Sequence, residues 1–191
     1  MNFDNAKIQK AFQWLKKSNG ENFLPHDEYC PTRDIFQARL DRMTRELQKV
    51  AALTDIYSLI TAIAGEFGNN SFDHNLGSWR DVPGIYFIYD IENRFFVIAD
   101  RGQGVLSTLR HIRPELPAAK DALKIAFTEA VSGRAPEQRG NGLKFVDSVV
   151  KQNSFELHFY SGDALYAVKN NSSHFDLSEE DLTGVIAVCS F

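Results

Sequence analysis

Polar side chains lie where the apolar face of a helix is expected, in the segment 54–77 of this 191-residue chain. At about 100° per residue, they fall within about a quarter-turn of Ile63, which must face the core together with Phe67. They are Glu66, Asn70, Asp73 and His74. Because an unpaired polar group is unfavourable in a protein interior, this face either lines a polar cavity that holds a ligand or emerges into water at the helix end.

Two glycine-rich segments could bring the backbone close to a ligand. Residues 100–104 read D-R-G-Q-G and follow the apolar run 95–99, and their alternate glycines permit a close approach or a positive φ. Residues 139–143 read R-G-N-G-L and open a predicted helix, whose free N–H groups and dipole favour phosphate. Taken alone, each segment is more often an ordinary turn or loop.

The order of these motifs resembles that of the GHKL ATPase family, which comprises gyrase, the ninety-kilodalton heat-shock chaperones, histidine kinases and MutL. Residues 66–74 match the N box of the family, residues 100–104 its first glycine box and residues 140–143 its second. The resemblance covers residues 52–191 and implies an α+β fold of the Bergerat type, a two-layer α/β sandwich with a largely antiparallel mixed sheet. It also implies that the chain binds ATP and Mg²⁺.

The resemblance implies a role for each motif residue. Glu66 is similar to the general base that orients an attacking water or hydroxyl, and Asn70 is similar to the Mg²⁺ ligand. Asp100 is similar to the residue that accepts a hydrogen bond from the exocyclic amine of adenine. The other positions implied to contact the nucleotide are Asp73, His74, Gly102, Gly104, Arg139, Gly140, Asn141, Gly142 and Leu143.

Residues 105–139 correspond to the ATP lid of the family. The segment contains three prolines and little continuous apolar periodicity, so we expect it to be mobile without nucleotide. Arg134 lies within it and, like Arg139, is a candidate for a cationic contact with phosphate. The last strand of the family commonly begins with Gly-Thr, whereas Thr183 here precedes its glycine, so we assign Thr183 no binding role.

Apolar spacing and capping residues predict the elements that position these motifs. The predicted helices are one through residues 8–15, one capped by Thr32, one that Thr54 caps and that runs to Gly77, one near residues 119–132 and one that begins at Asn141. The predicted strands are 84–89 and 94–99, which form a hairpin, and then 155–160, 164–169 and 184–191, with a turn at residues 161–163. Together they predict a layer of helices on a largely antiparallel sheet.

Residues 1–50 are predicted to form an N-terminal helical extension to an ATP-binding domain over residues 51–191. Within the extension, apolar residues recur with heptad spacing. They are Phe36, Leu40, Met43, Leu47 and Val50. Two heptads are short for an independent coiled coil, so this stripe either packs against the domain or forms the seam of a homodimer.

Composition argues against several classes of protein. A net charge of −4 without a long basic run argues against a nucleic-acid partner. Two cysteines, Cys30 and Cys189, can form neither a disulfide framework nor a four-ligand zinc site, and we expect Cys189 in the core. No apolar stretch approaches the ~20 residues of a membrane span, and the first residues lack the pattern of a signal peptide, so we expect a cytoplasmic protein.

The length leaves no room for the second domain through which gyrase, MutL and the heat-shock chaperones transduce nucleotide binding. We therefore expect a histidine-kinase-like protein that hydrolyses ATP or phosphorylates a separate partner protein in bacterial-type signalling. None of the five histidines lies in a phosphoacceptor context, and His158 is expected on the surface of a strand. The alternative is an anti-sigma-like, nucleotide-gated binding module without turnover, but Glu66 favours the enzyme because a pure sensor needs no base.

Overall fold

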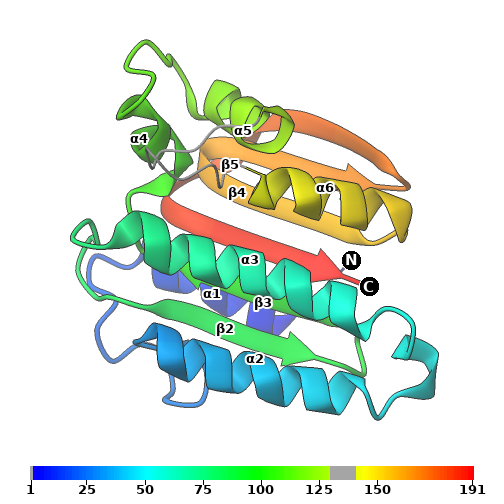
Figure 1. Ribbon diagram of the computed structural model, residues 1–191. Helices are drawn as coiled ribbons and strands as arrows, with labels where there is room; N and C mark the ends of the chain where they lie inside the picture. Colours follow the sequence, from blue (N-terminus) through cyan, green and yellow to red (C-terminus); the bar gives the residue numbers. More distant parts are fainter. Residues whose placement is uncertain (1, 130–140) are drawn as a thin grey trace.

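The computed structural model describes residues 2–129 and 141–191 (Figure 1). In chain order, the described residues form α1 (Ala6–Lys16), β1 (Tyr29–Cys30), α2 (Arg33–Leu47), the 3-10 helix η1 (Ala51–Leu53), α3 (Tyr57–Asn75), β2 (Ile85–Asp90), β3 (Phe95–Asp100), α4 (Gly104–Arg110), α5 (Ala119–Thr128), α6 (Gly142–Gln152), β4 (Glu156–Lys169) and β5 (Ser172–Ser190). None of these helices is long and apolar enough to span a membrane.

The strands form one sheet in the order β1-β2-β3-β5-β4, and every neighbouring pair is antiparallel. The predicted α+β class and the hairpin of β2 and β3 are confirmed, and the described sheet is antiparallel rather than mixed. The central strand β3 is buried along its whole length, in agreement with its continuous apolar sequence. Its last residue, Asp100, pairs with Ile85 on one side and Val185 on the other, so this carboxylate lies where β3 ends and β2 begins, beside β5.

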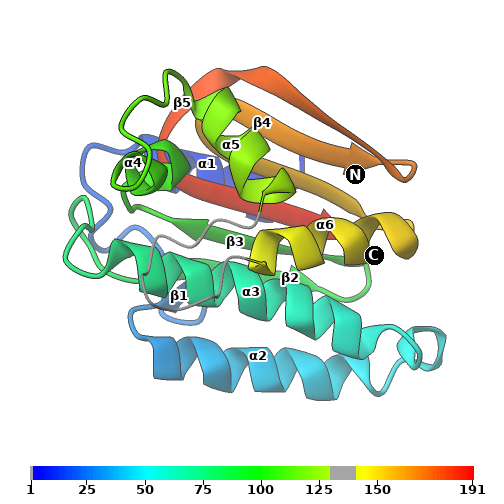
Figure 2. The same ribbon diagram turned by 45° about the horizontal axis from the view of Figure 1, so that its top comes forward.

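Helices cover both faces of the sheet. The helices α2, α3, α5 and α6 lie on one face, whereas α1 lies behind the sheet on the other, as Figure 2 also shows. Side chains alternate along β3, so Phe96 and Ile98 pack with α3 while Phe95 and Val97 pack with α1. The main body is therefore a layer of helices on a sheet, and α1 adds a further layer on the opposite face.

The heptad stripe of α2 belongs to the core of the domain. Phe36, Leu40, Met43 and Leu47 are each at most 6% exposed and share a cluster with residues of α3 and β3. Gly68 of α3 permits this close packing, because a Cβ at that position would lie 2.1 Å from the ring of Phe36. The stripe packs against the domain, and the alternative of a dimer seam through the same residues is therefore wrong.

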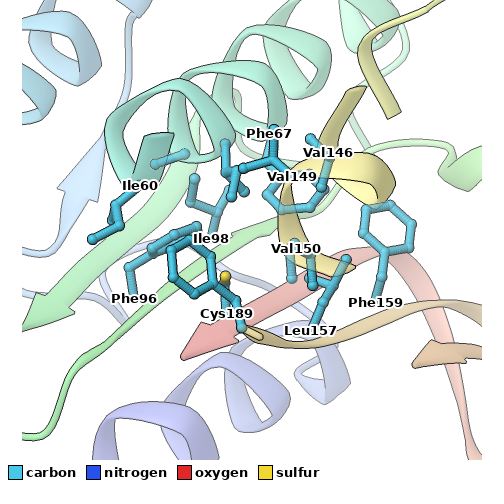
Figure 3. Packing of buried hydrophobic residues seen from close by; sticks show 14 of the residues in the cluster. Ile60, Phe67, Phe96, Ile98, Val146, Val149, Val150, Leu157, Phe159 and Cys189 are labelled. Atoms are coloured by element: carbon cyan, nitrogen blue, oxygen red, sulfur yellow. The ribbon is translucent and has the colours of Figure 1, made fainter. Parts of the chain in front are cut away.

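The largest core lies between α3, α6 and the sheet (Figure 3). Phe67 of α3 contacts Phe159 of β4, with ring centroids 5.5 Å apart, and Cys189 of β5 is buried in the same cluster as expected. Phe159 also contacts Phe127 of α5 at 5.2 Å, and Phe127 stacks on Tyr166 at 4.0 Å. This row of aromatic rings joins α3, which carries the polar residues, to α5 through β4.

The last two strands are longer than the sequence predicts. The turn expected at residues 161–163 is a β-bulge with Gly162 at a φ of +62°, and β4 continues through it. The chain reverses instead at Asn170 and Asn171, which both have positive φ, and β5 begins at Ser172. Asparagine tolerates this left-handed conformation better than most residues, so the reversal follows from local chemistry.

Two single-residue expectations are also wrong. Thr54 lies at the end of η1 and does not cap α3, whose first turn has no side-chain cap. His158 is half-buried rather than exposed, because its ring lies 4.8 Å from the ring of Phe3, which packs on the face of the sheet that α1 covers. Burial there lowers the pKa of His158 to about 4.

Arg101 follows β3 and is fully buried on the face of the sheet that α1 covers. Its guanidinium donates to both carboxylate oxygens of Asp81, with Nε at 2.8 Å, and its hydrogen bonds hold the pKa of Asp81 at about 2. It also donates to the backbone carbonyls of Trp14, Leu15 and Lys17 at the C-terminal end of α1. A cation at this position pairs with carbonyls of the last turn, where few intrahelical donors remain, and interacts favourably with the helix dipole.

Asp81→Ala should strongly destabilise the fold, because it leaves Arg101 as a buried charge without its carboxylate. Breaking a buried ion pair in this way typically costs about 3–5 kcal/mol, which urea unfolding would measure. Lys16→Ala is a matched control on α1, because its pair with Glu180 is exposed and its loss should stay within about 1 kcal/mol. Equal losses in the two variants would contradict the role of Arg101 in holding α1.

Candidate functional site

A pocket lies between the C-terminal half of α3, the end of β3 and the first turns of α4 and α6. Its sheet side is apolar and consists of Ile98, Phe159, Val185 and Ala187. Its α3 side carries the polar residues Asn70, Ser71, His74 and Asn75. Asp100 also lines the pocket although it is only 2% exposed. Apolar walls with a few convergent polar groups are typical of a small-molecule site.

Asp100 is a carboxylate buried at the base of this arrangement. Burial raises its pKa from 3.8 to about 6, although three hydrogen bonds to the carboxylate act in the opposite direction. Oδ1 accepts from the N–H of Gly102 at 2.9 Å and from Nδ2 of Asn75 at 3.1 Å, and Oδ2 accepts from the hydroxyl of Ser71 at 2.7 Å. An ionised carboxylate has about four acceptor sites, so these three donors leave Oδ2 able to accept one more.

The two glycines after Asp100 have different structural tasks. Gly102 packs under the loop, and a Cβ there would lie 2.0 Å from the side-chain amide of Asn75. Gly104 has a φ of +75°, begins α4 and lines the pocket. Of the two glycines expected to lie against a base, Gly104 alone is therefore at the pocket, and Gly102 is required by a neighbouring side chain.

Glu66 and Asn70 meet the first turn of α6. A Cβ on Gly142 would lie 2.3 Å from Oε2 of Glu66 and 3.9 Å from Nδ2 of Asn70, so the α6 backbone approaches these side chains closely. Asn70 lines the pocket, and Glu66 lies beside it against Gly142. Burial raises the pKa of Glu66, and the negative charge of Asp73 raises it further. The helix α3 and the first turn of α6 are thus in contact through these residues.

The first turn of α6 faces the pocket through Gly142 and Leu143. Asn141 is exposed at the N-cap, and its side chain gives this turn no capping hydrogen bond. The backbone N–H groups of such a turn, together with the helix dipole, form a site that attracts anions. Three other predicted phosphate contacts lie outside the described residues, namely Arg134, Arg139 and Gly140.

Asp73 and His74 point in different directions from adjacent positions of α3. His74 lines the pocket, and its backbone carbonyl accepts a hydrogen bond from Nε2 of Gln103 at 2.7 Å. Asp73 forms an ion pair with Arg33 at the start of α2. Because consecutive side chains of a helix differ by about 100°, the structure brings His74 to the pocket and turns Asp73 toward α2.

Three polar residues of the site were not predicted from the sequence. Ser71 and Asn75 continue the i, i+4 row that begins at Phe67, and this spacing was a signal that could have found them. Ser161 had no such signal, because its hydroxyl reaches the N–H of Val105, at 3.0 Å, only through the bulge in β4.

The segment expected to be a mobile lid is helical over most of its described part. Its two helices, α4 and α5, pack against each other through a small cluster of Leu109, Leu116 and Ala122. Both helices contribute residues to the pocket and form one of its walls. The expected lid also includes residues 130–139, which lie outside the described residues. Thr183, which was given no binding role, is exposed.

No protein-family model matches this sequence, and no curated protein is significantly similar to it. Within residues 2–129 and 141–191, no group of three or more His, Cys, Asp or Glu side chains is arranged to hold a metal ion. The case for a function therefore rests on the geometry and chemistry of the pocket.

Asp100→Asn should stabilise the ligand-free protein at neutral pH. The folded-state pKa of about 6 exceeds the ordinary value of 3.8, so the folded protein binds the proton more tightly and loses stability as the pH rises through this interval. A tenfold change in proton affinity corresponds to about 1.4 kcal/mol. The free energy of unfolding of Asp100→Asn should therefore exceed that of wild type by up to about 3 kcal/mol above about pH 6 and equal it below about pH 4. Urea unfolding at pH 4.5 and pH 7.5 would measure this difference.

Asp90→Asn is the matched control with the opposite sign. Although burial acts in the other direction, hydrogen bonds from Lys7 and Asn93 hold the pKa of Asp90 at about 2. Replacing this carboxylate with the amide of asparagine should therefore destabilise the protein at pH 7.5. A loss of stability in Asp100→Asn at pH 7.5, similar to that in Asp90→Asn, would contradict an unfavourable burial of the Asp100 charge.

Proposed function

We propose that this chain is a GHKL-type ATP-binding protein with histidine-kinase-like activity toward a separate partner protein. The observation that carries the proposal is the buried Asp100 carboxylate, which can accept one further hydrogen bond beside apolar walls. Adenine is flat and largely apolar at its faces, and its amino group can supply that one donor. Gly104 supports this assignment, because a glycine at the pocket lets the backbone lie close to a base.

The phosphate groups of the nucleotide are proposed to bind at the first turn of α6. Gly142 and Leu143 line the same pocket as Asp100, so one ligand can reach both the carboxylate and this helix N-terminus. Asn70 lies beside the same turn, with Nδ2 of its side-chain amide toward Gly142. The oxygen of that amide is a hard ligand suited to Mg²⁺ together with phosphate oxygens and water. When bound, Mg²⁺ would neutralise charge on the phosphates.

Glu66 is proposed to be the general base. Its raised pKa lies closer to the neutral range in which a general base is effective, and its carboxylate lies against the helix turn assigned to phosphate. There it would orient a water or a hydroxyl of the partner and accept its proton. The reaction is accordingly ATP hydrolysis or phosphoryl transfer, in a proposed cytoplasmic signalling role.

ATP should bind at least about tenfold more tightly than GTP, a difference of about 1.4 kcal/mol. Guanine presents a carbonyl oxygen where adenine presents its amine, and this oxygen would face the Asp100 carboxylate without a proton between them. Calorimetry with Mg²⁺ would measure both affinities. Asp100→Asn should lose most ATP binding while remaining folded, whereas Asp90→Asn should bind ATP normally. Equal affinities for the two nucleotides would refute the assignment of the base site.

Glu66→Gln should reduce phosphate release by about 100-fold or more while leaving ATP affinity nearly unchanged, because the amide keeps the shape but cannot accept a proton. Glu92→Gln, in the exposed turn between β2 and β3, is the matched control and should release phosphate at the wild-type rate. Near-zero rates in both wild type and Glu66→Gln, with unchanged ATP affinity, would support the nucleotide-gated binding module instead of the enzyme.

A further inference from the structure

Asn75 has both ends of its side chain engaged beside the pocket and is only 4% exposed. Its Nδ2 donates to Oδ1 of Asp100 at 3.1 Å, and its Oδ1 accepts from the N–H of Gln103 at 3.1 Å. A single amide therefore connects the last turn of α3 to both the carboxylate and the loop that follows it. Because Asn75 belongs to α3, it restrains the Asp100 carboxylate and the backbone of Gln103, which the loop alone would leave free to move.

Gly102 shows how closely the loop covers this amide. A Cβ at Gly102 would lie 2.0 Å from both Cγ and Oδ1 of Asn75. Gly102 is not among the glycines with positive φ, so the close side chain, rather than the backbone conformation, explains why glycine is present. The asparagine and the glycine therefore form a matched pair.

We propose that Asn75 is a positioning residue for the nucleotide, which holds the Asp100 carboxylate and the loop through Gly104 in the geometry that the base requires. This inference rests on the proposed function and deepens it. Asn75 donates a hydrogen bond to Oδ1 of Asp100, and Ser71 donates one to Oδ2. These two donors from α3 fix the orientation of the carboxylate and therefore the direction of the open acceptor site on Oδ2.

The hydrogen bond from Asn75 also affects the charge of Asp100. A donor to a carboxylate favours the ionised form, and the contact with Asn75 is one of those that lower the pKa of Asp100 against the effect of burial. Only the ionised form can accept a hydrogen bond from an amine at every oxygen site. Without Asn75, the pKa of Asp100 should rise and ATP affinity should be lost at a higher pH.

Within residues 2–129 and 141–191, few other ionisable groups surround the Asp100 carboxylate. On α3 they are His74, which lines the pocket, and Glu66, which lies beside it. Arg101 is adjacent in sequence, but its side chain lies on the opposite face of the sheet with Asp81. The neighbours of Asp100 in β2 and β5 are Ile85 and Val185, and α4 and α6 contribute Val105 and Leu143 to the pocket. Because His74 and Glu66 are common to wild type and variants, a change in pH dependence can be assigned to Asn75.

The test compares Asn75→Ala with the double variant Asn75→Ala/Gly102→Ala. The added methyl group falls where the amide was, so the double variant restores packing without restoring the hydrogen bond. Asn69→Ala is the matched control, because Asn69 lies on α3 but pairs with Gln37 of α2. Carbon-detected NMR of the ligand-free proteins would give the pKa of Asp100, and calorimetry from pH 6 to pH 8.5 would give the ATP affinity.

Both Asn75 variants should show a raised Asp100 pKa and a weaker ATP affinity, with the greatest loss at low pH. If the pKa rises from about 6 to about 7, the ionised fraction at pH 6 falls about fivefold and is nearly restored at pH 8.5. Asn75→Asp offers a nearly isosteric second variant, which keeps an acceptor for Gln103 but sets a second carboxylate against Asp100 and should raise the apparent pKa as well.

An unchanged Asp100 pKa in the folded variants would overturn the inference, and so would an equal loss of ATP affinity at every pH, which marks a merely structural role. The NMR measurement needs no nucleotide and separates the two proposals. If wild type fails to bind ATP, the proposed function fails, while a raised pKa in the Asn75 variants would still support the action of Asn75 on the carboxylate.

Discussion

A carboxylate buried at the end of the central strand is the constraint on which the rest of the site depends. An ionised group is unfavourable in a protein interior unless donors replace its hydration. Asp100 has three such donors, yet burial still raises its pKa to about 6. A residue that lowers the stability of the fold in this way is characteristic of a functional site, because a core built for stability alone would have an apolar or neutral side chain there.

The strand that ends with Asp100 also organises the opposite face of the sheet. Arg101 is buried among the carbonyls that end α1 and the carboxylate of Asp81, whereas Asp100 binds side chains of α3. Two neighbouring residues thus connect β3 to a helix on each face. The loop that follows is restrained from both sides, and such restraint keeps a binding group in place before the ligand arrives.

The packing of α3 against several elements explains why polar residues lie on the side of this helix that should face the core. It contacts the sheet through Phe67, α2 through Gly68 and the start of α6 near Glu66 and Asn70. A helix with neighbours on several sides cannot have one apolar and one solvated face. Glu66, Asn70 and His74 lie at or beside a pocket, whereas Asp73 pairs with Arg33 of α2, so this face lines a polar pocket over most of its length.

The order of the motifs, through its resemblance to that of the GHKL ATPase family, implied that Asn70, His74, Asp100, Gly104 and Gly142 lie near one another. Local patterns in the sequence were sufficient for the α+β class and the hairpin of β2 and β3. These inferences depend on periodicity and turn chemistry, which act within a few residues. The fold decided whether the heptad stripe of α2 met another chain or its own domain, because both uses bury the same apolar face.

Only the tertiary structure decided the contacts between residues far apart in the chain. The direction of Asp73 toward Arg33 and the burial of Arg101 against α1 depend on how helices pack. The need for glycine at position 102 depends on the side chain of Asn75, from another element. A sequence contains both members of such a pair, but its local periodicity does not state which residues will meet, since that follows from the packing of the whole domain.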